Sequence, residues 1–130
     1  MGRNVRTLLV VAAVAETVTG LALLVLPSMV VRLLFGAETA GMGSIVSRVA
    51  GISLIALGVA CWPSGVARQA LYAMLIYNLL VALFLVFLGL GGKWIGILLW
   101  PAAAAHAVLT ILLARVWLND RKARAAELPN

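Results

Sequence analysis

Four polar side chains interrupt the apolar segments of this 130-residue chain, one in each segment: Glu16, Arg48, Asn78 and His106. Ionisable groups are costly in the hydrocarbon core of a membrane, and those that occur there usually face other helices and mark a functional site. Glu16 and His106 have side chains that can exchange protons, and Asn78 can both donate and accept hydrogen bonds. Together these residues define a candidate polar site, provided that the apolar segments bring them together.

Their depths along the segments favour such a meeting. At 1.5 Å per residue, Glu16, Asn78 and His106 lie roughly 13 to 18 Å from the inner ends of their segments, near the middle of a hydrocarbon core about 30 Å thick. Tyr77 falls close to the same level. Arg48 lies nearer the outer boundary, although its long side chain can reach toward Glu16. We therefore predict a polar cluster of Glu16, Asn78, His106 and Tyr77, with Arg48 as a conditional partner.

Each member also has a purely structural alternative. Glu16 can pair with Arg48 or His106 without handling a ligand, and Asn78 can serve only as an interhelical hydrogen-bonding group. Arg48 can instead extend to the outer headgroups. His106 is the only histidine and Cys61 the only cysteine, so the sequence predicts no metal or haem site and names no cofactor. For Cys61, we favour a small apolar residue near a helix end.

The elements that must position these groups are apolar helices. The chain is 65% hydrophobic and 11% charged, with a mean hydropathy of +1.14, and its apolar runs are long and do not alternate. Such runs are typical of membrane-spanning helices. We predict an all-α fold, an antiparallel bundle of four transmembrane helices with a short interfacial helix between the first two. The predicted spans are residues 7–26, 45–62, 66–90 and 94–117, within a membrane domain of residues 1–118, and the interfacial helix covers 28–35. Residues 119–130 form a polar cytoplasmic tail that frays after a turn or two.

Several local features refine this arrangement. Small residues share stripes with the polar groups, including Ala12, Ala13 and Gly20 near Glu16 and Gly51 and Gly58 near Arg48, which favours close helix packing on those faces. The tight turn at residues 64–65 predicts that the second and third spans are antiparallel neighbours. Pro101 predicts a bend within the fourth span that frees the carbonyl of Ile97, with a small pocket opening outward there.

The net charge of +6 fits a membrane surface better than nucleic acid, because the basic residues lie at the ends of apolar segments. With both termini inside, seven basic residues lie on the inner side and two, Arg32 and Lys93, on the outer side. The inner group consists of Arg3, Arg6, Arg68, Arg115, Arg121, Lys122 and Arg124. This bias predicts that both termini are cytoplasmic. A rival interpretation is cleavage at the signal-like motif of residues 13–15, which would leave three spans.

Motifs in the first half of the chain carry a resemblance to a known family. They are Glu16-x3-Gly20, Pro27, Leu34-Phe35-Gly36, Arg48-x2-Gly51 and Gly58. This frame, over about residues 5–60, resembles small bacterial four-helix membrane proteins of the DoxX-like kind and related uncharacterised families. The resemblance implies a four-span protein of the bacterial inner membrane, and some such proteins are small subunits of membrane oxidoreductases. No lysine follows Gly20, where Leu21 to Leu26 continue the apolar run, and no catalytic residue is carried over.

Three classes of function remain open. The leading hypothesis is a non-catalytic membrane subunit or scaffold that packs against itself as a homo-oligomer or joins a larger membrane complex. The second is a protein that handles a small molecule, lipid, quinone or proton through the polar cluster. The third is a membrane-embedded enzyme with Glu16 and His106 as acid and base. A dry, internally paired cluster favours the first class, and a cavity enclosed by these groups favours the others.

Overall fold

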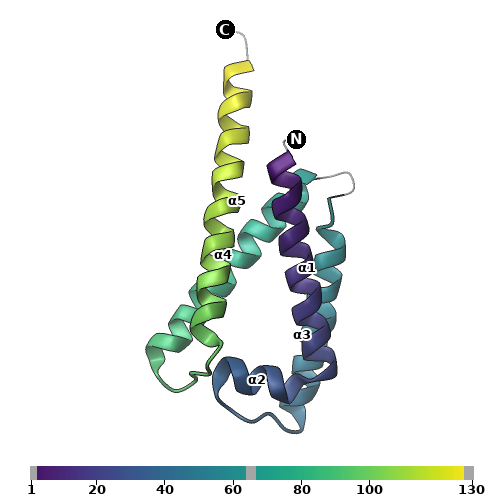
Figure 1. Cartoon of the computed structure of the whole chain (residues 1–130), viewed down its shortest axis with the longest axis vertical. Coiled ribbons are helices and arrows are strands. Elements are labelled where there is room, and N and C mark those ends of the chain that lie inside the picture. The colour runs from purple at the N-terminus through teal and green to yellow at the C-terminus, as the bar shows by residue number, and fades with distance from the viewer. Residues whose placement is uncertain (1–2, 64–66, 128–130) are drawn as a thin grey trace.

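The computed structural model describes residues 3–63 and 67–127, which form five α-helices and no strands. The helices are α1 (Arg3–Val25), α2 (Pro27–Phe35), α3 (Met42–Ala60), α4 (Ala67–Gly91) and α5 (Leu99–Glu127). Figure 1 shows α1 running down from the N-terminal end and α3 running back up beside it, while α2 lies across the lower end. The predicted all-helical class is confirmed.

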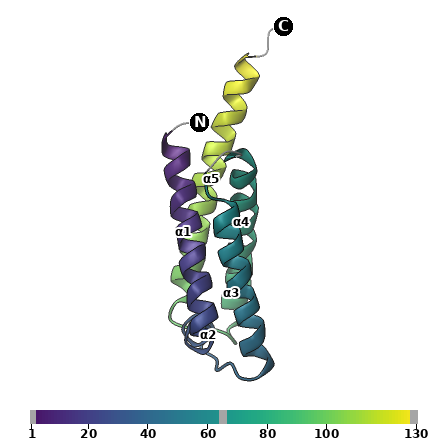
Figure 2. The ribbon, with the colours of Figure 1, turned by 90° about the vertical axis from the view of Figure 1, so that its right-hand side faces the viewer.

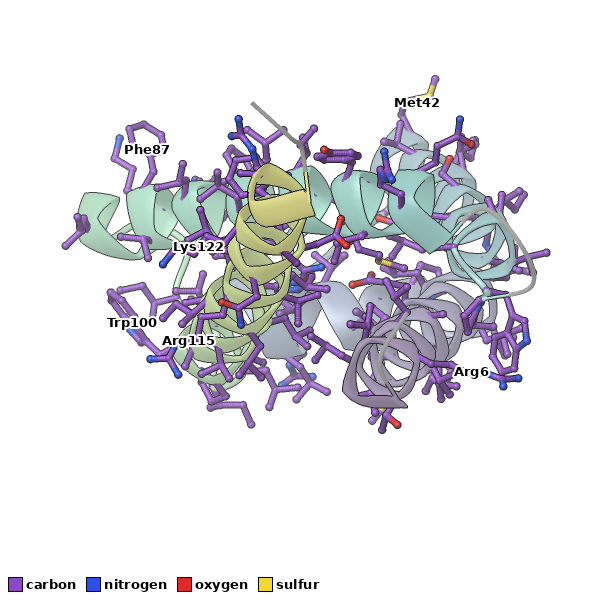
Figure 3. The ribbon with its side chains drawn as sticks, turned by 90° about the horizontal axis from the view of Figure 1, so that it is seen from above. Arg6, Met42, Phe87, Trp100, Arg115 and Lys122 are labelled. Carbon is purple, nitrogen blue, oxygen red and sulfur yellow. The ribbon has the colours of Figure 1, made fainter. Side chains whose placement is uncertain are left out.

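Four of these helices, α1, α3, α4 and α5, are long and apolar enough to cross a membrane. Their qualifying segments are Val5–Val25, Met42–Ala60, Arg68–Gly91 and Leu99–Ala123. Most of their apolar side chains point away from the protein. Met42, Phe87 and Trp100, for example, extend from the edge of the molecule in Figure 3, and Phe87 is 71% exposed. Side chains of this kind fit a hydrocarbon surrounding.

The close pairing of α1 with α3 depends on glycines. A methyl group built on Gly20 would lie 2.5 Å from the carbonyl oxygen of Gly51, and one built on Gly51 would lie 2.6 Å from that of Gly20. One turn or two further along, Gly58 abuts the Ala13 carbonyl and the Thr17 hydroxyl. No larger residue fits at these points while the helices keep this separation. The predicted small-residue stripes therefore form the α1–α3 interface.

The second pair is α4 with α5, and it corrects one prediction. The second and third long helices, α3 and α4, are not packed along one another: α3 packs chiefly against α1, and α4 chiefly against α5. In Figure 1, α4 runs obliquely from beside the upper end of α3 to the lower end of α5, whereas the long helices look nearly parallel from the side in Figure 2. A short turn fixes where two helices begin and end, but the glycine face of α3 is already occupied by α1. The predicted turn at residues 64–65 lies outside the described residues.

The connection from α4 to α5 corrects a second prediction. The fourth long helix begins at Leu99, not at residue 94, so Pro101 lies in its first turn. There a proline removes no internal hydrogen bond and introduces no kink. Residues 94–98 instead cross the end of α2, with the Gly96 amide donating to the Leu34 carbonyl (3.0 Å) and the Leu98 amide to the Leu33 carbonyl (2.9 Å).

This crossing satisfies the last carbonyls of α2, which a helix leaves without internal partners. Gly36 ends α2 in the left-handed conformation, with φ of 68°. Gly96 lies directly against the Leu33 backbone, so a side chain at this position would collide with it. Backbone from α2 fills the space that Gly96 leaves, so the bend and the loose packing from which the outward pocket was predicted are not found there.

The buried core lies nearer the end of the molecule where the N- and C-termini of the chain lie. It contains Leu9, Ala12, Ala13, Cys61, Ala70, Leu71, Met74 and Leu113, drawn from all four long helices or their ends. Cys61 is 2% exposed and sits just after α3, as a small apolar residue near a helix end. At this same end, α5 continues to Glu127, so the described part of the predicted polar tail extends the helix and does not fray as predicted.

Candidate functional site

Glu16 projects from the middle of α1 into the protein interior, where it is 3% exposed. Its carboxyl group hydrogen-bonds with the hydroxyl of Tyr77 on α4, and the protonated phenol is the donor. Small residues on the same face, Ala12, Ala13 and Gly20, are also buried, so the neighbouring helices approach this face closely. The contact joins the α1–α3 pair to α4 across the protein interior.

Asn78, the next residue on α4, is fully buried and bonds to two partners. Its amide nitrogen donates to the Met74 carbonyl one turn earlier (2.8 Å), and its amide oxygen lies 2.8 Å from Nδ1 of His106 on α5. A carbonyl oxygen can only accept, so the amide nitrogen must face Met74 and the amide oxygen must face His106. The His106 Nδ1 therefore carries the proton and donates it to this bond.

Tyr77 connects the two hydrogen-bonded pairs. Its ring meets the ring of His106 edge to face, with centroids 6.0 Å apart and an interplanar angle of 75°. Glu16, Tyr77, His106 and Asn78 therefore form a continuous series of contacts from α1 through α4 to α5. The structure brings together the four residues predicted to share a depth, and we call these four the polar cluster.

Arg48 does not join them. It is exposed, and its Nη1 donates to the Leu24 carbonyl at 2.6 Å. Leu24 is the penultimate residue of α1, where helix carbonyls lack internal partners and a cationic side chain is favoured. Arg48 therefore caps the end of α1 from the neighbouring helix α3. The predicted reach of Arg48 toward Glu16 is wrong, because the open end of α1 lies closer than the interior carboxyl.

The helix hydroxyls near the polar cluster are bonded within their own helices. Thr17 donates to the Ala13 carbonyl and Thr110 to the His106 carbonyl, each at 2.8 Å. Back-bonded hydroxyls of this kind are satisfied without a ligand. Among the described residues, no group of three or more His, Cys, Asp or Glu side chains is placed to hold a metal ion. The side chains of the polar cluster can form hydrogen bonds, and those of Glu16 and His106 can exchange protons.

One feature of the interior was missed at the sequence level. The buried indole N–H of Trp117 on α5 has no hydrogen-bond partner among the described residues. Its ring packs edge to face with Tyr72, with centroids 6.4 Å apart, and the Arg121 guanidinium lies 4.9 Å above it. The positions 117 and 121, one turn apart and aromatic then basic, could have signalled this cation–π contact. This cation–π contact lies toward the end with the chain termini, away from the polar cluster.

No protein-family model, curated protein or solved structure matches the chain. The resemblance of residues 5–60 to DoxX-like proteins therefore stays a prediction.

Proposed function

We propose that the chain is a four-span membrane protein whose long helices form an antiparallel bundle, with α2 in the interface and both termini in the cytoplasm. Four helices of spanning length and predominantly apolar, exposed surfaces support this placement. The bias of basic residues toward the end with the termini supports the orientation. The resemblance to DoxX-like proteins supports a bacterial inner membrane.

Within that membrane we propose a non-catalytic role, as a subunit or scaffold that packs against itself or a larger complex. The observation that carries this proposal is the internal pairing of the polar cluster. Glu16 bonds with Tyr77, and Asn78 bonds with both His106 and the Met74 backbone. Groups that hydrogen-bond with one another join helices within the protein and leave few free hydrogen-bond donors or acceptors for a substrate. Glu16 and His106 each bond a different partner, which does not favour an acid–base pair.

Native mass spectrometry in detergent tests this role, comparing the wild type with Glu16→Gln. Glutamine keeps the size of the side chain and an oxygen that can accept from Tyr77. We expect the same oligomeric state or complex for both proteins and no co-purifying small molecule whose retention depends on Glu16. A small molecule that is retained by the wild type and lost from Glu16→Gln would contradict the scaffold role.

The same outcome would support a second candidate, a protein that handles a proton or small molecule through the polar cluster. One observation favours it: the contacts from Glu16 through Tyr77 to His106 are continuous across three helices. Since Nδ1 of His106 is committed to Asn78, Nε2 is the nitrogen through which this imidazole would act. A bound species that depends on Glu16 would identify the polar cluster as its site.

A further inference from the structure

A second polar site lies at the end of the molecule opposite the N- and C-termini of the chain. It is an open cleft of about 410 Å³ between α2 and the chain that follows it, and five residues line it: Ser28, Met29, Arg32, Glu38 and Thr39. Figures 1 and 2 show α2 lying across this lower end of the molecule. None of the five lining residues belongs to the polar cluster, so the cleft requires its own explanation.

The cleft is shaped by local backbone features. Gly36 turns the chain out of α2 with φ of 68°, and Gly41 turns it into α3 with φ of 54°. Between these glycines the chain passes back along α2, where the Ser28 hydroxyl donates to the Thr39 carbonyl at 3.2 Å. This bond holds residues 38–39 over the same side of α2 that carries Ser28 and Arg32, which are one helical turn apart.

Opposite charges meet in this cleft. Arg32 on α2 and Glu38 on the returning chain both line it, and both are exposed. Arg32 supplies the positive side, because a guanidinium is suited to binding a phosphate through two hydrogen bonds. Glu38 in turn suits a cation that can donate hydrogen bonds.

We propose that this cleft binds the phosphoethanolamine headgroup of a membrane phospholipid. The phosphate accepts hydrogen bonds from the Arg32 guanidinium, and the ammonium group donates to the Glu38 carboxylate. This inference rests on the membrane placement proposed above, which puts α2 at the level of the outer headgroups. Met29 lines the same cleft and is 57% exposed, so an apolar side chain lies beside the polar groups, as a lipid that is polar at one end requires.

The charges distinguish this headgroup from its common alternatives. Phosphatidylglycerol has the phosphate but no cation for Glu38, and its net negative charge is repelled by that carboxylate. Phosphatidylcholine has a cation, but its trimethylammonium group has no N–H to donate. A chain of net charge +6 that bound lipids through charge alone would instead prefer the anionic phosphatidylglycerol. A preference for phosphatidylethanolamine is therefore diagnostic of the cleft.

The test is lipid retention by the full chain in detergent, measured by native mass spectrometry with equal amounts of the three phospholipids carrying identical acyl chains. We expect the wild type to retain phosphatidylethanolamine over phosphatidylglycerol, and Glu38→Gln to lower that ratio by about two- to fivefold, the range for an exposed ion pair. Arg32→Gln should lower retention of all three lipids. The control is Lys93→Gln, an exposed basic residue that does not line the cleft, and it should behave as the wild type.

The proposal is overturned if the wild type has no preference for phosphatidylethanolamine, if Glu38→Gln keeps the wild-type ratio, or if Lys93→Gln changes retention as much as Arg32→Gln does.

A lipid-free sample with soluble phosphoethanolamine distinguishes a lipid headgroup from a free phosphate compound as the ligand. Stoichiometric binding at micromolar concentration there would overturn a lipid as the ligand, because a headgroup site gains its affinity from the high local concentration at the membrane. Flotation with liposomes separates the two proposals: a chain that does not float contradicts the membrane placement, whereas one that floats without lipid preference contradicts only the headgroup site.

Discussion

Asn78 is held in one orientation by two partners whose roles are fixed. The Met74 carbonyl can only accept, so it takes the amide nitrogen, and the amide oxygen is left to accept from His106. The backbone of α4 thereby determines which nitrogen of an imidazole on α5 carries a proton. In a medium without water, a side chain that is anchored at both ends positions its neighbour more firmly than a single interhelical bond would.

Tyr77 is the residue whose hydroxyl can be tested with the least disturbance. Tyr77→Phe removes the donor to Glu16 and leaves a buried carboxyl without that bond. We expect the free energy of unfolding to fall by about 1–2 kcal/mol, between the cost of an unsatisfied buried group and the smaller values measured for bonds in membrane proteins. Equilibrium unfolding in mixed detergent micelles measures the change.

The control for this substitution is the other tyrosine. Tyr72 is 40% exposed and contacts Trp117 through its ring, which phenylalanine keeps. Tyr72→Phe should therefore change the free energy of unfolding by less than about 0.5 kcal/mol, as surface substitutions usually do. Equal losses from both tyrosines would show that the Glu16–Tyr77 bond contributes no stability of its own.

At the scale of the helices, the α1–α3 pair depends on a backbone contact that admits no side chain. Gly51→Ala places a methyl group 2.6 Å from the Gly20 carbonyl and 2.9 Å from the Leu24 amide. Because both neighbours are backbone, the helices must move apart, and we expect a loss of about 1–3 kcal/mol, typical of overpacking. The midpoint of thermal unfolding in detergent should fall accordingly.

Gly91→Ala is the matched control for that change. Gly91 is the last residue of α4, and a methyl group there meets no atom within 4 Å. The same substitution should be neutral or slightly stabilising, because it removes only the extra freedom of glycine in the unfolded chain. If Gly51→Ala were also neutral, the close approach of α1 and α3 would not be a determinant of stability.

The sequence predicted helices better than it predicted how they meet. Residue type and depth were enough to bring Glu16, Tyr77, Asn78 and His106 together, because position along a helix follows directly from residue number. Arg48 and Pro101 were placed wrongly for a shared reason. The position of each depends on carbonyls at a helix end. Arg48 donates to a carbonyl at the end of α1, and the segment that precedes Pro101 donates to carbonyls at the end of α2. Which carbonyls are open depends on where helices end, and helix ends are read least reliably from a sequence.

At the scale of the whole molecule, the chain consists of two helix pairs, α1 with α3 and α4 with α5, that contact each other over a limited area. Three features join them. The buried apolar core contains residues from both pairs. The polar cluster links α1, α4 and α5 in the interior, and the segment before α5 is hydrogen-bonded to the end of α2. The polar contacts add directional bonds to the apolar packing and so constrain how the pairs are oriented. The internal pairing of the cluster is thus a sufficient reason for its burial under the proposed non-catalytic role.

The orientation of this arrangement in the membrane follows from its two ends. Figure 3 looks onto the end with the N- and C-termini of the chain, and Arg6, Arg115 and Lys122 are labelled in it. Arg32 on α2 and Lys93 between α4 and α5 lie at the other end. The positive-inside bias supports the proposed placement of the first end in the cytoplasm. With Cys61 replaced by serine, single cysteines at Lys122 and Lys93 report the two sides. In intact cells, a membrane-impermeant maleimide should label Lys93→Cys and not Lys122→Cys, and permeabilised cells should label both. Labelling of Lys122→Cys alone in intact cells would show the opposite topology, in which α2 and its charged cleft lie at the cytoplasmic surface.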